Sequence, residues 1–273
     1  MKAVCALMLL FGGSVAHADT FAPVLEQSAR PPVAADTRPS DSLIVAGQAD
    51  TISSGHGGGG GSLDWVRASV NGTTLTAGVS SFSIGDSHWS FGRVGGALRP
   101  DERTIVQGQA SLGSGRTAGA LFAYRLFNAG LSYAASSAVY VKAEDQFVDI
   151  GATHGHLLKA GALLLPSTRL SADISYAHSL SGNLNSEFAA ARVDWQTEPA
   201  RLLGGLAWGR SAPDLLNIDV GSGNGEHAFR EFFVGMAIPV SGVELMAVAD
   251  FVNLDTGRKR TLTFSLKIPL GGT

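Results

Sequence analysis

The chain has 273 residues, of which 45% are hydrophobic and 16% charged, with 35 Gly and one Cys. Soluble domains carry about 25% charged residues, so this chain is poor in charge, yet it is too hydrophobic to be disordered throughout. A single Cys excludes a disulfide scaffold, and a bundle of membrane helices is excluded because no run approaches the about 20 apolar residues that one span needs. The formal charge of −3 gives no reason to expect nucleic acid as a partner.

The first 18 residues have the features of a secretory signal peptide. Lys2 supplies the positive start, residues 3–11 form a short apolar core, and Ala16-His17-Ala18 is a cleavage site of the small-x-small type. Because Cys5 lies before this site, the mature chain would contain no cysteine and would be held together without disulfides. The sequence therefore predicts export.

Residues 19–62 are predicted to form a flexible periplasmic neck. They contain four prolines and end in a run of five glycines, Gly57 to Gly61, flanked by serines, a composition typical of flexible coil. Residues 43–46 are a short isolated apolar stretch that could form a strand. The alternative is a segment that orders only on a partner.

Alternation of apolar and polar residues dominates from residue 63 to residue 273. In the last segment Leu262, Phe264 and Leu266 alternate with Thr261, Thr263 and Ser265, and residues 170–177 and 189–196 behave in the same way. This period of two places the two sets of side chains on opposite faces of a sheet. Turn residues recur between these runs, which gives about 14 strands, or 12 if the boundaries near residues 127–129 and 136–138 are not real.

A membrane barrel explains these strands better than a soluble β-sandwich. The alternating runs reach the about 9–11 residues that a tilted spanning strand needs, whereas globular strands usually have about 5–6. In the clearest strands the charged residues share one face, as in a barrel with an apolar outer wall and a polar interior. Trp195 and Trp208 fall on the apolar face near opposite strand ends, where aromatic residues meet the membrane interfaces. A secreted soluble β-protein stays the alternative.

The expected connections support the same orientation. With the C-terminus in the periplasm, residues 99–104, 153–156, 182–186, 213–227 and 255–260 would face outward. The shorter turns at 114–116, 166–168, 197–200 and 240–242 would face the periplasm. Long outer loops and short inner turns are characteristic of such barrels.

Residues 63–270 thus resemble Gram-negative outer-membrane β-barrel proteins. The resemblance implies an all-β fold, an antiparallel up-and-down transmembrane barrel of 12–14 strands, located in the outer membrane. It also implies contact with outer-membrane lipid and insertion by the barrel assembly machinery, which reads the last strand. That strand commonly ends in an aromatic residue, whereas here Leu270 is followed by Gly271, Gly272 and Thr273.

Charged residues within the strands are the candidates for the interior of the barrel. Unpaired charge is costly next to lipid, so a dense cluster at residues 142–149 is expected to pair across the lumen or with Arg93 and Arg125. The predicted lumen-lining residues are Asp173, Arg192, Asp194, Lys267, Lys142 and Glu144. They could form a selective constriction or a salt-bridged, plugged interior.

These observations lead to a non-catalytic channel for a small polar solute or a saccharide, with no cofactor and no metal, whose neck could dock a periplasmic partner. One alternative is a lipid hydrolase that uses His178 as a base with Ser179 or Ser181 as nucleophile. These serines stand at i+1 and i+3 and face away from His178 unless a bulge intervenes. Another is an adhesive barrel acting through outer-loop residues Asp214, Asp219, Glu226 and His227.

Overall fold

The computed structural model describes residues 40–53, 57–69, 72–211, 227–255 and 257–271. The predicted signal peptide and most of the predicted neck lie outside these residues. No helix in the described part of the chain is long and apolar enough to cross a membrane.

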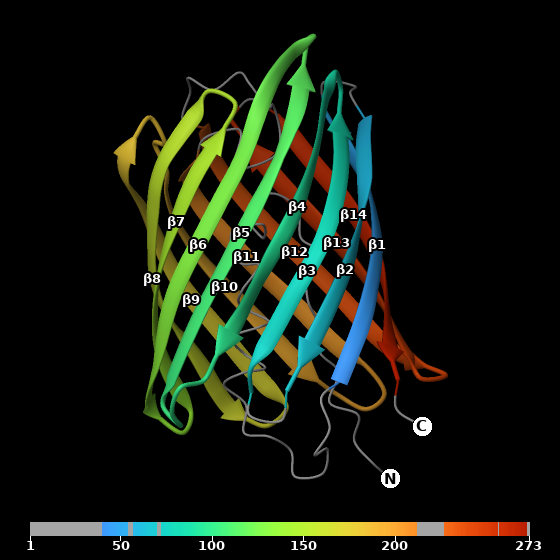
Figure 1. Cartoon of the computed structure of the whole chain (residues 1–273), viewed down its shortest axis with the longest axis vertical. Coiled ribbons are helices and arrows are strands. Elements are labelled where there is room, and N and C mark those ends of the chain that lie inside the picture. The colour runs from blue at the N-terminus through green and yellow to red at the C-terminus, as the bar shows by residue number, and fades with distance from the viewer. Residues whose placement is uncertain (1–39, 54–56, 70–71, 212–226, 256, 272–273) are drawn as a thin grey trace.

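Fourteen antiparallel strands form one closed barrel, in which each strand pairs with its neighbours in the sequence and β1 pairs with β14 (Figure 1). The prediction of an up-and-down barrel is confirmed, at the upper of the two expected strand counts. The strands are β1 Ser40–Ile52, β2 Gly57–Ala68, β3 Thr74–Ile84, β4 Ser87–Leu98, β5 Thr104–Thr117, β6 Ala120–Ser136, β7 Val139–Ile150, β8 Thr153–Ser167, β9 Leu170–Gly182, β10 Glu187–Gln196, β11 Arg201–Ser211, β12 His227–Val240, β13 Val243–Leu254 and β14 Arg258–Leu270.

The barrel begins at Ser40 and not at residue 63, so the predicted neck boundary is wrong. Residues 43–46 lie in β1, and the glycine run opens β2 with Gly58 opposite both Asp50 and Ile84. Glycines carry no side chain, so they cannot show the alternation that reveals a strand. Backbone hydrogen bonds, which need no side chain, nevertheless hold this segment in the wall.

The strand count is right although one of the predicted boundaries is absent. Residues 127–129 lie inside β6, which has 17 residues, while residues 137 and 138 do separate β6 from β7. The predicted boundary that is absent lowers the strand count by one, and β1, which was not predicted, raises it by one. The β5–β6 hairpin, green in Figure 1, is built from two of the longest strands and rises above the rest of the rim.

The ends of the barrel are defined by the direction of the strands. β1 begins and β14 ends at one end, here called the terminal end, and the other is called the far end (Figure 1). The connections at 183–186 and 255–257 lie at the far end and those at 197–200 and 241–242 at the terminal end, as predicted. Three predictions are wrong: residues 99–103 turn at the terminal end, residues 114–116 lie within β5, and residues 153–156 lie within β8. The first error follows from the extra boundary predicted near residues 127–129, which reverses the end assigned to the earlier connection, and the others follow from misplaced turns.

Short turns close the hairpins with the backbone that twisted strands require. Ala118 and Gly119 have φ of 47° and 86°, and Ser241 and Gly242 have φ of 49° and 85°. Positive φ at both central residues is the signature of the tightest hairpin turn. The Ser241-Gly242 pair was identifiable from the sequence because Gly adopts this conformation without steric cost.

The side chains divide between the two faces of the wall. On β14, Leu262 and Phe264 are 44% and 58% exposed on the outside, whereas Thr261 and Thr263 are buried inside. Trp195 and Trp208 also lie on the outer wall. The exposed large hydrophobic residues are spread over nearly all strands, which gives the barrel the apolar belt expected of a lipid-facing wall.

The turn between β4 and β5 yields a pH prediction. The Oδ1 atom of Asp101 accepts hydrogen bonds from the backbone N–H groups of Arg103 and Thr104, each at 2.7 Å. These bonds, that of Arg103 first, hold the pKa of the Asp101 carboxyl below its ordinary value of 3.8. A lowered folded-state pKa stabilises the turn above the ordinary value, and this contribution is lost as the pH falls through the folded-state pKa.

We therefore expect amide-exchange protection of Arg103 and Thr104, corrected for intrinsic rates, to be constant above about pH 5 and to fall in acid. Asp101→Ala should remove this protection at every pH. The control is the turn at Asn183, whose neutral amide Oδ1 accepts the N–H of His154 at 2.8 Å. Equal acid sensitivity in both turns would contradict the assignment.

Candidate functional site

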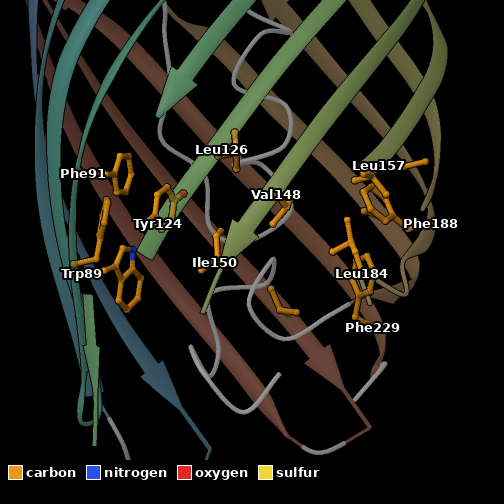
Figure 2. Packing of buried hydrophobic residues seen from close by; sticks show 14 of the residues in the cluster. Trp89, Phe91, Tyr124, Leu126, Val148, Ile150, Leu157, Leu184, Phe188 and Phe229 are labelled. Carbon is orange, nitrogen blue, oxygen red and sulfur yellow. The ribbon is translucent and has the colours of Figure 1, made fainter. Parts of the chain in front are cut away.

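The inner face of the barrel at the far end is apolar. Its aromatic members, called here the aromatic collar, are Phe82, Trp89, Phe91, Tyr124, Phe188 and Phe229, all at most 5% exposed. The Phe91 and Tyr124 rings are stacked, with centroids 4.5 Å apart and planes at 5°, and Phe188 and Phe229 meet edge to face at 5.8 Å. Figure 2 shows the two aromatic groups on different parts of the wall, with Leu126, Val148 and Ile150 between them.

The collar was not foreseen from the sequence, although β3 carries a signal for it. Leu75 and Val79 point outward, and further along the same strand Phe82 and Ile84 point inward. In the sequence this reads as a broken alternation. It marks the height at which the interior changes from polar to apolar.

Nearer the middle of the wall the inner face carries ion pairs. Arg93 on β4 donates from Nε to Asp64 Oδ1 on β2 at 2.6 Å, and a second contact joins its other nitrogen to Oδ2. Lys142 on β7 pairs with Asp173 on β9. These side chains are largely buried, so each charge is neutralised within the wall, as a low-dielectric environment requires.

A third group of charges lies on β10 and β11. Asp194 accepts from Arg201 Nε at 2.7 Å, and Arg192 Nη2 lies 3.8 Å from the same carboxylate. All six predicted lumen residues thus project from the inner face: Asp173, Arg192, Asp194, Lys267, Lys142 and Glu144. That they line a conducting path stays a prediction.

The charge cluster at 142–149 divides between the two faces. Lys142 and Glu144 point inward, whereas Asp145 and Asp149 occupy the outer wall. Arg125 is also outside, where Nη1 lies 3.0 Å from Asp149 Oδ2. The predicted pairing of the cluster with Arg125 is therefore present, but on the outer wall and not in the interior. Adjacent residues of a strand point to opposite faces, and a dense run of charge therefore cannot belong to one face.

A second charge cluster lies where β12, β13, β14 and β1 adjoin. Asp50 of β1 and Asp250 of β13 both stand opposite Thr261 of β14, and the next row toward the far end holds Lys259 and Glu231. We call these four charged residues, Asp50, Glu231, Asp250 and Lys259, the carboxylate cluster. All are at most 4% exposed. The sequence offered a hint, because β14 is polar at every inward position from Lys259 to Thr263.

The residues of the hydrolase alternative lie on β9. His178 is on the outer wall opposite Glu187, and the Ser179 hydroxyl accepts the N–H of Ser186 at 3.2 Å. In the described residues no hydrogen bond joins His178 to Ser179 or Ser181. A bulge beside Leu157 places Ser181 opposite His156, and the Nδ1 atom of His156 lies 3.0 Å from Asp145 Oδ2 on the outer wall.

The predicted outer-loop site lies mostly outside the described residues. Asp214, Asp219 and Glu226 are not described by the structure. Of the four predicted residues His227 alone can be placed, and it lies at the start of β12. Its Nδ1 atom is 2.9 Å from Asp255 Oδ1 in the β13–β14 connection. This contact joins the start of β12 to the β13–β14 connection at the far end.

Comparison with solved structures gives the class of this fold. The chain is similar to the CymD monoaromatic hydrocarbon channel, with a TM-score of 0.63, 11% identity and coverage of 98% of this chain and 99% of that one. The Pseudomonas putida toluene transporter TodX matches with a TM-score of 0.57, 10% identity and coverage of 97% and 100%. Acinetobacter baumannii outer membrane protein Omp33 matches with a TM-score of 0.52, 12% identity and coverage of 85% and 99%.

The fold is therefore that of the Gram-negative outer-membrane β-barrels, as the sequence predicted. The closed wall and its apolar outer belt agree with that location. No protein-family model matches the chain, and no curated protein matches it either.

Proposed function

We propose that this protein is a non-catalytic outer-membrane channel for a small amphipathic solute that carries an apolar ring. The aromatic collar is the observation that carries the proposal. A barrel in lipid needs an apolar outer wall, but lipid does not require its interior to be apolar. Stacked rings on the inner face at one end, followed by charged groups, suit a molecule with an apolar part and a polar part.

Two similar structures support the solute class, because they are described as a monoaromatic hydrocarbon channel and a toluene transporter. The sequence-based expectation of a small polar solute or a saccharide is the competing proposal. Both proposals require conduction, and they differ in which molecule interrupts the current.

The test is the conductance of the full protein in planar lipid bilayers, with 2-phenylethanol or glucose added at the far end. We expect conductance, interrupted by 2-phenylethanol more strongly than by glucose. Phe91→Leu/Tyr124→Leu should weaken the aromatic interruption about tenfold, because stacking is lost while apolar volume is kept. Phe127→Leu, which removes an outer-wall ring packed on Phe147, is the control.

Two results would reject parts of this proposal. An ion-tight barrel would reject the channel, and it would favour the structural or adhesive alternative if trimming residues 213–227 removed a binding phenotype. Interruption by glucose but not by 2-phenylethanol would reject the ring-bearing solute in favour of the saccharide.

A lipid hydrolase is the second candidate, and the outer wall favours His156 over His178 as its base. With Asp145 at Nδ1 and Ser181 on the neighbouring strand, Nε2 of His156 could take the Ser181 proton as Oγ attacks a lipid ester. If so, phospholipid hydrolysis in mixed micelles would be lost in His156→Ala and kept in His178→Ala. Our channel proposal expects no hydrolysis by the unmodified protein.

A further inference from the structure

The carboxylate cluster carries an inference about the solute, which rests on the proposed channel function. We propose that Asp250 and Glu231 recognise a cationic nitrogen, so that the preferred solute is a small aromatic amine in its ammonium form. The inference adds the charge of the polar group to the ring already proposed.

Asp50 is fully satisfied within the wall. Its carboxylate accepts the Thr261 hydroxyl at 2.6 Å and the Gln48 amide at 2.8 Å, and Lys259 Nζ lies 3.7 Å away. The side chains of Asp50 and Lys259 are 0% and 1% exposed. Lys259 Nζ thus lies beside an acid that already accepts two hydrogen bonds.

Asp250 is in the opposite situation. It is 2% exposed, and neither of its carboxylate oxygens accepts a hydrogen bond. The groups that act on it are the ammonium of Lys259, the backbone N–H of Phe251 and two further acids, Glu231 and Asp50. A buried carboxylate with unsatisfied oxygens is costly unless a donor reaches it, so Asp250 is a site that awaits a hydrogen-bond donor.

The charge balance shows which donor fits. Three acids face one lysine in this part of the inner wall, which leaves an excess of negative charge. An ammonium group supplies both positive charge and three hydrogen-bond donors. In the described part of the chain no three side chains of His, Cys, Asp or Glu are grouped as metal ligands, which favours an organic cation.

The surroundings supply the apolar half of the site. Val252 stands directly opposite both Glu231 and Lys259, and it belongs to the same apolar cluster as Phe188 and Phe229. Phe229 is two residues from Glu231 on the inward side of β12. A ring seated on the collar could therefore place an attached ammonium group toward the carboxylates, and aromatic faces themselves attract organic cations.

The test uses two probes that differ only in the polar group, 2-phenylethylammonium and 2-phenylethanol. Calorimetric binding to the full protein in detergent at pH 8 should show the ammonium bound at least tenfold more tightly. In Asp250→Asn/Glu231→Gln the two probes should bind with about equal affinity, while the affinity for 2-phenylethanol stays as in the unmodified protein. Glu187→Gln removes one acid from the outer wall, where it accepts a hydrogen bond from Tyr176, and should keep the preference.

Equal binding of the two probes to the unmodified protein would overturn the inference, as would a preference that survives in the double variant. Heat-modifiable migration on gels confirms that each variant is folded, and single variants replace the double variant if it is not. The conductance measurement in bilayers tests the channel function separately from the preference for an ammonium solute. A conducting protein without the ammonium preference contradicts this inference alone, whereas a protein that never conducts contradicts the channel.

Discussion

Replacing Gly60 by Ala should prevent the barrel from closing properly at β2 and β3. A Cβ atom at Gly60 would lie 2.3 Å from the Ser81 carbonyl oxygen and 2.8 Å from the Phe82 Cα, both of them backbone atoms. Backbone cannot move aside as a flexible side chain can, so the two strands must separate. We expect a loss of about 3 kcal/mol in the free energy of unfolding, at the upper end of overpacking costs.

Gly57→Ala is the matched control, in the same glycine run. Its added Cβ would meet nothing closer than the Asp50 carbonyl oxygen at 3.7 Å, an ordinary contact. Urea unfolding followed by heat-modifiable migration on gels measures both variants. If residues 19–62 were a flexible neck, both substitutions would be silent, so equal tolerance of the two would restore that interpretation.

Removing Arg93 should be the most damaging change among the inner-wall charges. In Arg93→Met the Asp64 carboxylate stays buried, and its further partner among the residues that the structure describes is the Ser62 hydroxyl at 3.2 Å. An uncompensated buried charge of this kind costs about 3–5 kcal/mol. The double variant Arg93→Met/Asp64→Leu should recover most of this loss, because it removes both charges together.

The outer-wall pair Arg125–Asp149 provides the comparison, since the Arg125 side chain is 57% exposed. Arg125→Met should cost less than about 1 kcal/mol, as exposed ion pairs usually do. Unfolding in urea at one salt concentration compares all three variants. Similar losses for Arg93→Met and Arg125→Met would show that the Asp64 pair is as well solvated as the outer one.

The sequence predicted the fold wherever the two faces of a strand differ in chemistry. In the middle of β9, β10 and β14 the charged residues Asp173, Asp194 and Lys267 lie on the inner face among apolar residues that point outward, so alternation and placement could both be inferred. In β2 the glycines leave both faces without side chains. The pairing of this strand depends on backbone hydrogen bonds that composition does not reveal.

The site was predictable only in part, for a related reason. Asp173, Asp194 and Lys267 could be assigned to the inner face because their strands alternate cleanly. The carboxylate cluster depends on register between strands that are distant in the chain, as in the row that joins Asp50, Thr261 and Asp250. No local pattern encodes that register.

The pairing of β1 with β14 has a consequence for how the molecule forms. Asp41 lies opposite Leu270, so the contact that completes the wall joins nearly the two extremes of the described chain. Contacts of such long sequence separation form slowly, since a large loop must be ordered first. Until then the first and last strands are open edges able to bind other chains, so the growing sheet needs protection from aggregation until its very last step.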